Sequence, residues 1–201
     1  MPTLYIIAGC NGSGKTTTAN TLLPGYLNCN EFVNADILAE GMQPFASGPV
    51  LILAGKAMLN IVKDLMQRRV DFTIETTLSG RGVYERIIEE CQEVGYNVII
   101  LFVRLDSVEL AISRVGKRVK RGGHHIPEED IRRRYRRGVV NFFDIYSKKC
   151  DSWVLVDNSG LKPVIVAESK DRVDFKVFNY EIWSQIMYDY KAFKIGGTRN
   201  T

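Results

Sequence analysis

The stretch Gly9-Cys10-Asn11-Gly12-Ser13-Gly14-Lys15-Thr16 matches the pattern G-x-x-x-x-G-K-[ST]. The apolar run from Leu4 to Ala8 before it is typical of a buried parallel strand, and residues 17–23 after it predict a helix. Glycines let successive backbone N–H groups point into one concave nest, to which the helix start adds its dipole. A chance glycine-rich turn would not need this strand-and-helix setting. The stretch therefore predicts a site for the phosphates of a nucleoside triphosphate.

Two side chains of this loop have separate expected roles. Lys15 supplies a cation to the outer phosphates, and the Thr16 hydroxyl is the candidate Mg²⁺ ligand. Asn158, after the last core strand, offers an amide donor and acceptor to adenine, although a plain turn explains it equally well. The residues expected to bind ATP are Gly9, Asn11, Gly12, Ser13, Gly14, Lys15, Thr16, Thr17 and Asn158.

Composition limits the class of protein. The 201 residues, 45% hydrophobic and 25% charged, suit a single globular domain spanning 1–201. No apolar run approaches the ~20 residues of a membrane span, and the first strand is too short for a signal peptide. The four cysteines form no CxxC pair and the two histidines are adjacent, which argues against a zinc site or a disulfide framework. The expected location is the cytoplasm, with no membrane partner.

Positive charge is concentrated in one segment. Residues 114–137 hold ten Lys/Arg and three acids, a net charge of +7, whereas the remainder has 17 basic and 20 acidic residues, or −3. The chain is therefore not basic throughout, as many sequence-independent nucleic-acid binders are. The cationic segment instead predicts an anionic partner close to one site.

Strand and helix patterns alternate along the chain. Apolar runs predict core strands at residues 4–8, 31–33, 72–74, 97–104 and 153–156, and an edge strand at 164–167. Helical patterns cover residues 17–23, 50–69, 83–94, 108–119, 127–145 and 180–193. We expect a three-layer α/β P-loop kinase fold with a mainly parallel five-stranded sheet and a helical lid over about residues 107–145.

In such sheets ligands lie beyond the carboxyl ends of the strands. Asp36, after the second strand, is the candidate base that takes the proton of an acceptor hydroxyl; a Mg²⁺-shell role and a helix cap are the alternatives. Glu75, followed by Thr76 and Thr77, suits hydroxyl donors of a substrate, with a structural role as the alternative. The candidate acceptor-binding residues are Asp36, Glu75, Thr76, Thr77, Arg81, Arg114 and Arg134.

The proposed lid would bring guanidinium groups to the transferring phosphoryl group. Arg114, Arg118 and Arg121 are spaced i, i+4, i+7 and are the first candidates, with Arg134 and Arg137 as a second pair. Most of the cationic side chains fit a solvated helix face equally well. The candidate catalytic residues are Asp36, Lys15, Arg118 and Arg121, whereas His124 and His125 are expected to shape a loop.

The chain resembles the zeta-toxin family of P-loop kinases, and in particular its small single-domain branch named "predicted ABC-type ATPase". The stretches that carry the resemblance are residues 9–17, Val33-Asn34-Ala35-Asp36, Ile74-Glu75-Thr76-Thr77, Arg118 with Arg121 to Pro127, Arg133-Arg134-Tyr135 and Asp157 to Gly160. The resemblance implies a kinase-like sheet, ATP with Mg²⁺, a base role for Asp36, an acceptor-pocket role for Glu75 and lid arginines on the phosphates. Well-known members phosphorylate UDP-N-acetylglucosamine and are inhibited by an antitoxin that blocks the nucleotide site.

Three functions remain open from the sequence. The first is an ATP-dependent kinase that phosphorylates a hydroxyl of a small anionic metabolite such as a nucleotide sugar. The second is a kinase or NTPase acting on nucleic-acid ends. The net charge of −3 outside residues 114–137 and the lack of aromatic residues among the basic ones argue against it. The third is a nucleotide-gated binding protein, or toxin partner, with little catalysis.

Overall fold

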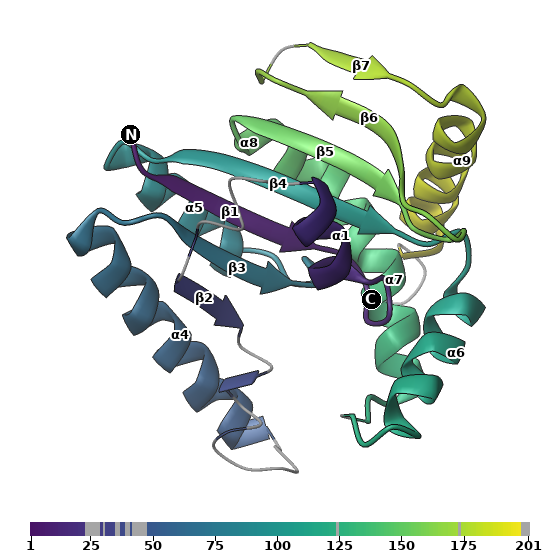
Figure 1. The fold of residues 1–201 in the computed structure, drawn as a ribbon, viewed down its shortest axis with the longest axis horizontal. Coiled ribbons are helices and arrows are strands. Elements are labelled where there is room, and N and C mark those ends of the chain that lie inside the picture. Colours follow the sequence, from purple (N-terminus) through teal and green to yellow (C-terminus); the bar gives the residue numbers. More distant parts are fainter. Residues whose placement is uncertain are drawn as a thin grey trace.

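A single mixed sheet organises the computed structural model, which describes residues 1–22, 29, 31–34, 37–38, 41, 48–123, 125–172 and 174–197. Within these residues the strand order is β2-β3-β1-β4-β5-β6-β7 (Figure 1). The parallel strands are β1 (Thr3–Ala8), β2 (Glu31–Asn34), β3 (Phe72–Thr76), β4 (Asn97–Arg104) and β5 (Ser152–Asp157). The predicted α/β fold with a mainly parallel sheet is confirmed.

The predicted number of strands was too small, because the sheet has seven strands rather than five. β6 (Val164–Ser169) pairs antiparallel with β5, and β7 (Phe175–Val177) pairs antiparallel with β6. β7 has three residues and all of them keep some solvent exposure. Such a short edge strand carries no clear apolar alternation, so sequence periodicity does not reveal it.

Helices cover both faces of the sheet. They are α1 (Lys15–Leu22), α4 (Gly48–Arg68), α5 (Val83–Glu93), α6 (Val108–Val119), α7 (Glu128–Asn141), α8 (Ser147–Lys149) and α9 (Tyr180–Gly197). In Figure 1, α1 lies in front of the sheet, and α5, α7 and α8 lie behind it. None of the helices in these described ranges is long and apolar enough to cross a bilayer.

Alternation along β1 divides the core between the two faces. Leu4, Ile6 and Ala8 join the large cluster under α4, α5 and α9, whereas Tyr5 and Ile7 pack with Ala19 of α1. This period of two is what a strand buried on both sides requires. The three-layer arrangement follows from it.

The segment predicted as one helix over residues 127–145 changes geometry part-way. α7 ends at Asn141, and a π-helical turn (Phe142–Tyr146) leads into α8. Phe142 and Tyr146 of this turn are fully buried. Helical spacing alone does not distinguish such a turn from continued α-helix.

Candidate active site

The phosphate-binding loop, residues 9–16, connects β1 to α1 and has the backbone that its glycines predict. Gly9 has φ +144°, and a Cβ atom there would lie 2.2 Å from the Val103 carbonyl oxygen. Gly14 has φ +81°, and a Cβ atom there would lie 2.5 Å from Asn158 Nδ2. Gly9 therefore excludes a side chain on steric grounds as well as on φ, whereas a side chain at Gly14 would be strained by its φ and would displace the Asn158 amide. The loop is fixed between β4 and the residues after β5.

Lys15 and Thr16 both contact Glu75. Lys15 Nζ lies 3.6 Å from Glu75 Oε1, and the side chains are only 9% and 16% exposed. Lys15 Nζ also donates to the carbonyl oxygens of Gly9 (3.2 Å) and Cys10 (3.4 Å). Thr16 Oγ1 donates to Glu75 Oε2 at 3.0 Å. The loop cation, the loop hydroxyl and an acidic side chain thus form one cluster.

The strand order explains why Glu75 reaches the loop. β3 lies next to β1, with Ile7 opposite Glu75 and Ala8 opposite Thr76. The amide of Gly9 continues this pairing by donating to the Thr76 carbonyl oxygen at 3.2 Å. Because parallel strands end at one edge, the Glu75 side chain is delivered directly beside residues 9–16.

The donor set around Thr16 fits Mg²⁺. A hydroxyl oxygen and a carboxylate oxygen 3.0 Å apart are hard oxygen ligands of the kind that Mg²⁺ selects. The set fits a nucleotide as well: Ser13 Oγ is buried and finds no hydrogen-bond partner among the described residues. An unsatisfied buried hydroxyl in a phosphate-binding loop suits an anionic oxygen.

A small pocket opens beside this cluster. Its volume is about 170 Å³, and polar side chains dominate its wall. The lining residues are Asn34, Glu75, Thr76, Thr77, Ser79, Gly80, Tyr84, Arg133 and Arg134. We call it the strand-end pocket. The sequence reasoning missed Asn34, Ser79, Gly80, Tyr84 and Arg133 as lining residues. Two of them carried a signal, because Asn34 lies two residues before Asp36 and Arg133 belongs to the Arg133-Arg134-Tyr135 stretch.

The two threonines at this edge shape the turn that follows β3. Thr76 Oγ1 accepts the amide of Leu78 at 3.1 Å, and the hydroxyls of Thr77 and Ser79 lie 2.9 Å apart. Both threonines still line the strand-end pocket. Arg81, beyond this turn, donates through Nε to Asn141 Oδ1 at 2.8 Å and does not line that pocket.

The helices α6 and α7 pack against the phosphate-binding loop through a second small core. Cys10 belongs to this core together with Val115 of α6 and Tyr135 of α7. Burial raises the pKa of the Cys10 thiol to about 11, so this side chain stays uncharged at neutral pH. Tyr135 Oη donates to the Leu105 carbonyl oxygen at 2.9 Å. The region predicted as a lid is therefore in contact with the loop.

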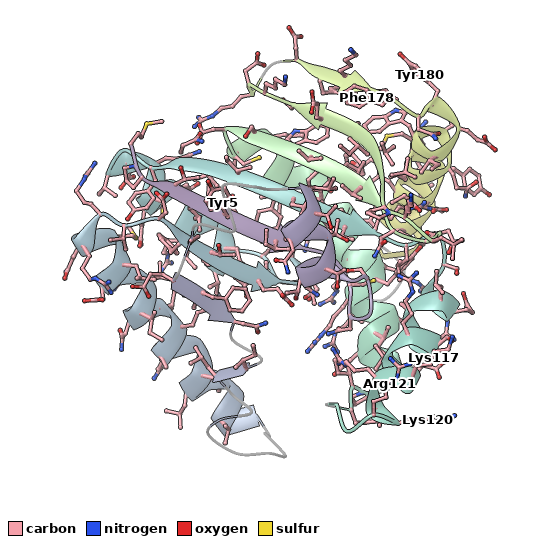
Figure 2. All side chains as sticks on the ribbon, viewed as in Figure 1. Tyr5, Lys117, Lys120, Arg121, Phe178 and Tyr180 are labelled. Atoms are coloured by element: carbon pink, nitrogen blue, oxygen red, sulfur yellow. The ribbon has the colours of Figure 1, made fainter. Side chains whose placement is uncertain are left out.

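The arginines of this region lie at different distances from the loop. Arg134 donates to Asn11 Oδ1 at 3.3 Å, and Arg114 donates to the Ser159 carbonyl oxygen at 3.3 Å. Arg118 and Arg121 are exposed, and Figure 2 places Arg121 at the end of α6 that is farthest from the sheet. Because α6 ends at Val119, Arg121 lies in the following turn and does not continue the predicted helical stripe.

Asn158 is tied to the phosphate-binding loop. Its Nδ2 donates to the Ser13 carbonyl oxygen at 2.8 Å. The preceding residue, Asp157, pairs with buried Arg104 at 2.7 Å, and Arg104 also reaches Asp189 of α9 at 2.9 Å. This charged cluster fixes the turn that carries Asn158.

Several predicted residues are not in this cluster. Thr17 is exposed on α1, and its carbonyl oxygen accepts the Thr21 hydroxyl at 3.1 Å. His125 is exposed. Asp36 and His124 lie outside the described residues, so the predicted roles of both remain predictions.

Comparison with known proteins identifies a family. The model of the family described as "Zeta toxin" matches residues 40–167, more than half of the chain, and the match begins after the phosphate-binding loop. An uncharacterized protein of Haemophilus influenzae is 28% identical over 127 residues, which cover 63% of this chain and 88% of that protein.

Solved structures share the fold. The AvrRxo1-ORF1:-ORF2 complex crystallised with ATP matches with a TM-score of 0.76 at 17% identity, over 92% of this chain and 63% of that chain. The PezAT chromosomal toxin-antitoxin system of Streptococcus pneumoniae matches with a TM-score of 0.63 at 14% identity, over 96% of this chain and 87% of that chain. This chain thus spans less than two thirds of the chain that it matches in the AvrRxo1-ORF1:-ORF2 complex. With a kinase-type arrangement of strand, loop and helix around Lys15, and with a family match over most of its length, the chain belongs to the zeta-toxin family of P-loop kinases.

Proposed function

We propose that this chain is an ATP-dependent kinase that transfers the γ-phosphate of ATP to a hydroxyl of a small anionic metabolite. A nucleotide sugar such as UDP-N-acetylglucosamine is the proposed acceptor. One observation carries the proposal: Glu75 contacts Lys15 and Thr16 and also lines a pocket whose wall includes Arg134, itself bonded to Asn11. Phosphate site, acidic side chain and a small polar pocket for the reacting end of the acceptor therefore meet at one point.

Residues 9–16 would hold the triphosphate. Lys15 would exchange its contact with Glu75 for the outer phosphates, and the backbone N–H groups would bind the remaining oxygens. Thr16 and Glu75 would provide oxygen atoms to a Mg²⁺ ion bound with ATP, which would supply positive charge to the phosphates. Asn158 would keep the loop in shape and approach adenine with its remaining amide oxygen.

The acceptor hydroxyl would enter the strand-end pocket. Its oxygen forms a new bond to the γ-phosphorus as the bond from that phosphorus to the β,γ-bridging oxygen breaks, and ADP leaves. We propose that Asp36 takes the hydroxyl proton, a contribution typically worth ~10²–10⁴ in rate. Thr76, Thr77 and Arg81 would position the acceptor, together with the lining side chains already described.

Movement of α6 and α7 as a lid is part of the proposal. The two helices share the small core to which Cys10 of the loop also belongs, and we propose that they shift together toward the phosphates when the nucleotide binds. Arg134 is already bonded to the loop, whereas the exposed side chains of Arg118 and Arg121 would reach the transferring group only after closure. Arg114 would leave its contact with the Ser159 carbonyl oxygen and move with α6 toward the phosphates. A positioned arginine is typically worth ~10³–10⁵ in the rate of phosphoryl transfer.

An antitoxin protein is the proposed macromolecular partner. The support is that the matched structures are an AvrRxo1-ORF1:-ORF2 complex and the PezAT toxin-antitoxin system. The partner would cover the nucleotide site, so its binding and that of a non-hydrolysable ATP analogue would exclude each other. A partner that bound without changing the affinity for the analogue would contradict this part of the proposal.

The activity is tested by incubating the protein with an extract of anionic metabolites and γ-labelled ATP, followed by mass spectrometry. We expect one class of hydroxyl-bearing metabolite to gain a labelled phosphoryl group. Lys15→Ala is the matched control and should abolish both nucleotide binding and product. Tight ATP binding with no labelled product from any pool would favour the nucleotide-gated binding protein instead.

A further inference from the structure

The sheet has an open edge at β7. This strand is the last in the sheet order, four places from β1, and it pairs only with β6 in the part of the chain that the structure describes (Figure 1). The phosphate-binding loop follows β1, so this edge is separate from the candidate active site. An edge strand presents unpaired N–H and C=O groups to which another strand can bond. The sheet can therefore be extended at β7.

The register of β7 determines which backbone groups point outward. Lys176 lies opposite Glu168 of β6, and the Phe178 amide donates to the Val166 carbonyl oxygen at 2.8 Å. The backbone groups of Lys176 and Phe178 therefore face β6. Because this direction alternates from residue to residue in an antiparallel ladder, the N–H and C=O groups of Phe175 and Val177 face away from the sheet.

The edge strand is held in place at both ends. Before β7, the Ser169 hydroxyl donates to the Asp174 carbonyl oxygen at 2.7 Å. After β7, Asn179 Oδ1 accepts the amide of Ile182 at 3.0 Å and fixes the start of α9. A strand that is already ordered loses little conformational entropy when a partner binds to it.

Aromatic side chains are exposed beside these backbone groups. Phe175 is 54% exposed, Phe178 47% and Tyr180 72%. Figure 2 shows Phe178 and Tyr180 where β7 leads into α9. The Phe175 ring packs with its centroid 5.2 Å from that of Trp183, so it is fixed on one side and open on the other. Exposed aromatic rings gathered beside an open strand edge are typical of a surface that a partner covers.

A single charge in the middle of β7 indicates the chemistry of the partner. Lys176 is exposed, its Nζ lies 5.1 Å from the centroid of the Phe178 ring, and it forms no ion pair among the described residues. Its cross-strand neighbour Glu168 pairs with Lys170 at 3.7 Å. An acidic residue directly opposite Lys176 on an added strand would be favourable, whereas a basic one would be repelled.

The same charge disfavours a second copy of this chain as the occupant. Two β7 strands can exchange hydrogen bonds through Phe175 and Val177 in an antiparallel arrangement. That arrangement places Lys176 directly opposite the same lysine of the second copy. Like charges in directly opposite positions destabilise a strand pair. The edge therefore suits a strand from a different protein.

We propose that β7 is a docking edge to which an extended segment of another protein adds as an antiparallel eighth strand. The segment carries aspartate or glutamate opposite Lys176 and apolar residues opposite Phe175 and Val177. Backbone bonds to these two residues provide affinity, and Lys176 provides charge selection. This surface lies beyond the proposed function and is distinct from the nucleotide site that an antitoxin would cover.

The probe is a rhodamine-labelled, capped peptide of sequence Thr-Val-Thr-Val-Glu-Val-Thr-Val-Thr, which has valines on one face and the glutamate on the other. Fluorescence anisotropy measures its affinity for the wild-type chain. One matched peptide has lysine in place of glutamate, and the other has methyl groups on the backbone nitrogens of the two valines beside the glutamate. Each should bind at least about fivefold more weakly, because it loses the cross-strand charge pair or the backbone bonds.

Variants of the protein test the same contacts from the other side. Lys176→Glu should reverse the preference, so that the lysine peptide binds more tightly than the glutamate peptide. Val177→Pro removes an outward amide without breaking the ladder with β6, and it should weaken the glutamate peptide about fivefold. Lys63→Glu makes the same charge change on an exposed position of α4 and should leave peptide affinity unchanged. Urea unfolding verifies that each variant is folded.

Hydrogen exchange locates the contact. The amides of Phe175 and Val177 should exchange more slowly when the glutamate peptide is bound, whereas the Lys176 amide, already in the ladder, should keep its rate. Failure of the wild type to bind the glutamate peptide, equal affinity for all three peptides, or unchanged exchange at both amides would overturn the proposal. A peptide-free dimer in sedimentation with both amides protected would overturn it in favour of a second copy. The affinity for AMP-PNP, a non-hydrolysable ATP analogue, tests the proposed function independently, and Lys176→Glu should leave it unchanged.

Discussion

Neutralising Glu75 should change nucleotide affinity in opposite ways with and without Mg²⁺. In the nucleotide-free protein Glu75 lies 3.6 Å from the Lys15 ammonium and accepts the Thr16 hydroxyl at 3.0 Å. A triphosphate must displace the first contact and then faces a nearby negative charge. Glu75→Gln keeps the shape of the side chain and removes the charge.

The expected magnitude follows from these contacts. Replacing a charge-assisted hydrogen bond with a neutral one changes its free energy by about 1–1.5 kcal/mol, which is about tenfold in affinity. In EDTA, Glu75→Gln should therefore bind AMP-PNP about tenfold more tightly than the wild type. In excess Mg²⁺ this advantage should vanish, because the carboxylate beside Thr16 attracts the metal.

Isothermal titration calorimetry under both conditions measures the effect. Glu93→Gln makes the same charge change on an exposed position of α5 and should leave both affinities unchanged. Weaker binding of AMP-PNP to Glu75→Gln in EDTA would refute the role assigned to the Lys15–Glu75 contact. If Mg²⁺ changed the AMP-PNP affinity of Glu75→Gln by the same factor as that of the wild type, Glu75 would have no role in binding the metal.

Two further outcomes concern stability. Arg104→Met should lower the free energy of unfolding by about 3–5 kcal/mol, because it leaves Asp157 and Asp189 near each other without their buried cation. Urea unfolding measures this free energy. A loss below about 1 kcal/mol would contradict the prediction. Burial raises the pKa of both Cys91 and Cys150 to about 12, so the folded state keeps protons that the unfolded chain loses above about pH 8.5. Stability should therefore fall from pH 9 to 11 by up to about 1.4 kcal/mol per pH unit for each thiol, and Cys91→Ala should show a shallower slope than the wild type under reducing conditions.

The phosphate-binding loop was the part of the fold that the sequence predicted best. Its glycines and the flanking apolar run specify a local structure, and β1 and α1 are found where they were expected. The parallel core strands followed from similar local signals, because each is a short apolar run between turn residues. Local sequence patterns were sufficient to predict those elements whose structure depends mainly on neighbouring residues in the chain.

The position of Glu75 was less accessible from the sequence. Its contact with Thr16 depends on β3 lying beside β1, and strand order is a tertiary property that no periodicity encodes. The strand-end pocket has the same origin, since its walls are distant in the sequence. The edge strand β7 was missed for a different reason, because three partly exposed residues leave no pattern.

The most direct test of the central claim compares Asp36→Asn with the wild type in two assays on the same protein samples. The account predicts that the affinity for AMP-PNP stays within about threefold, while phosphoryl transfer to the acceptor identified from the extract falls by at least about 10². Such a result would separate the nucleotide site from the group that activates the acceptor. Transfer by Asp36→Asn at the wild-type rate would contradict the proposed mechanism.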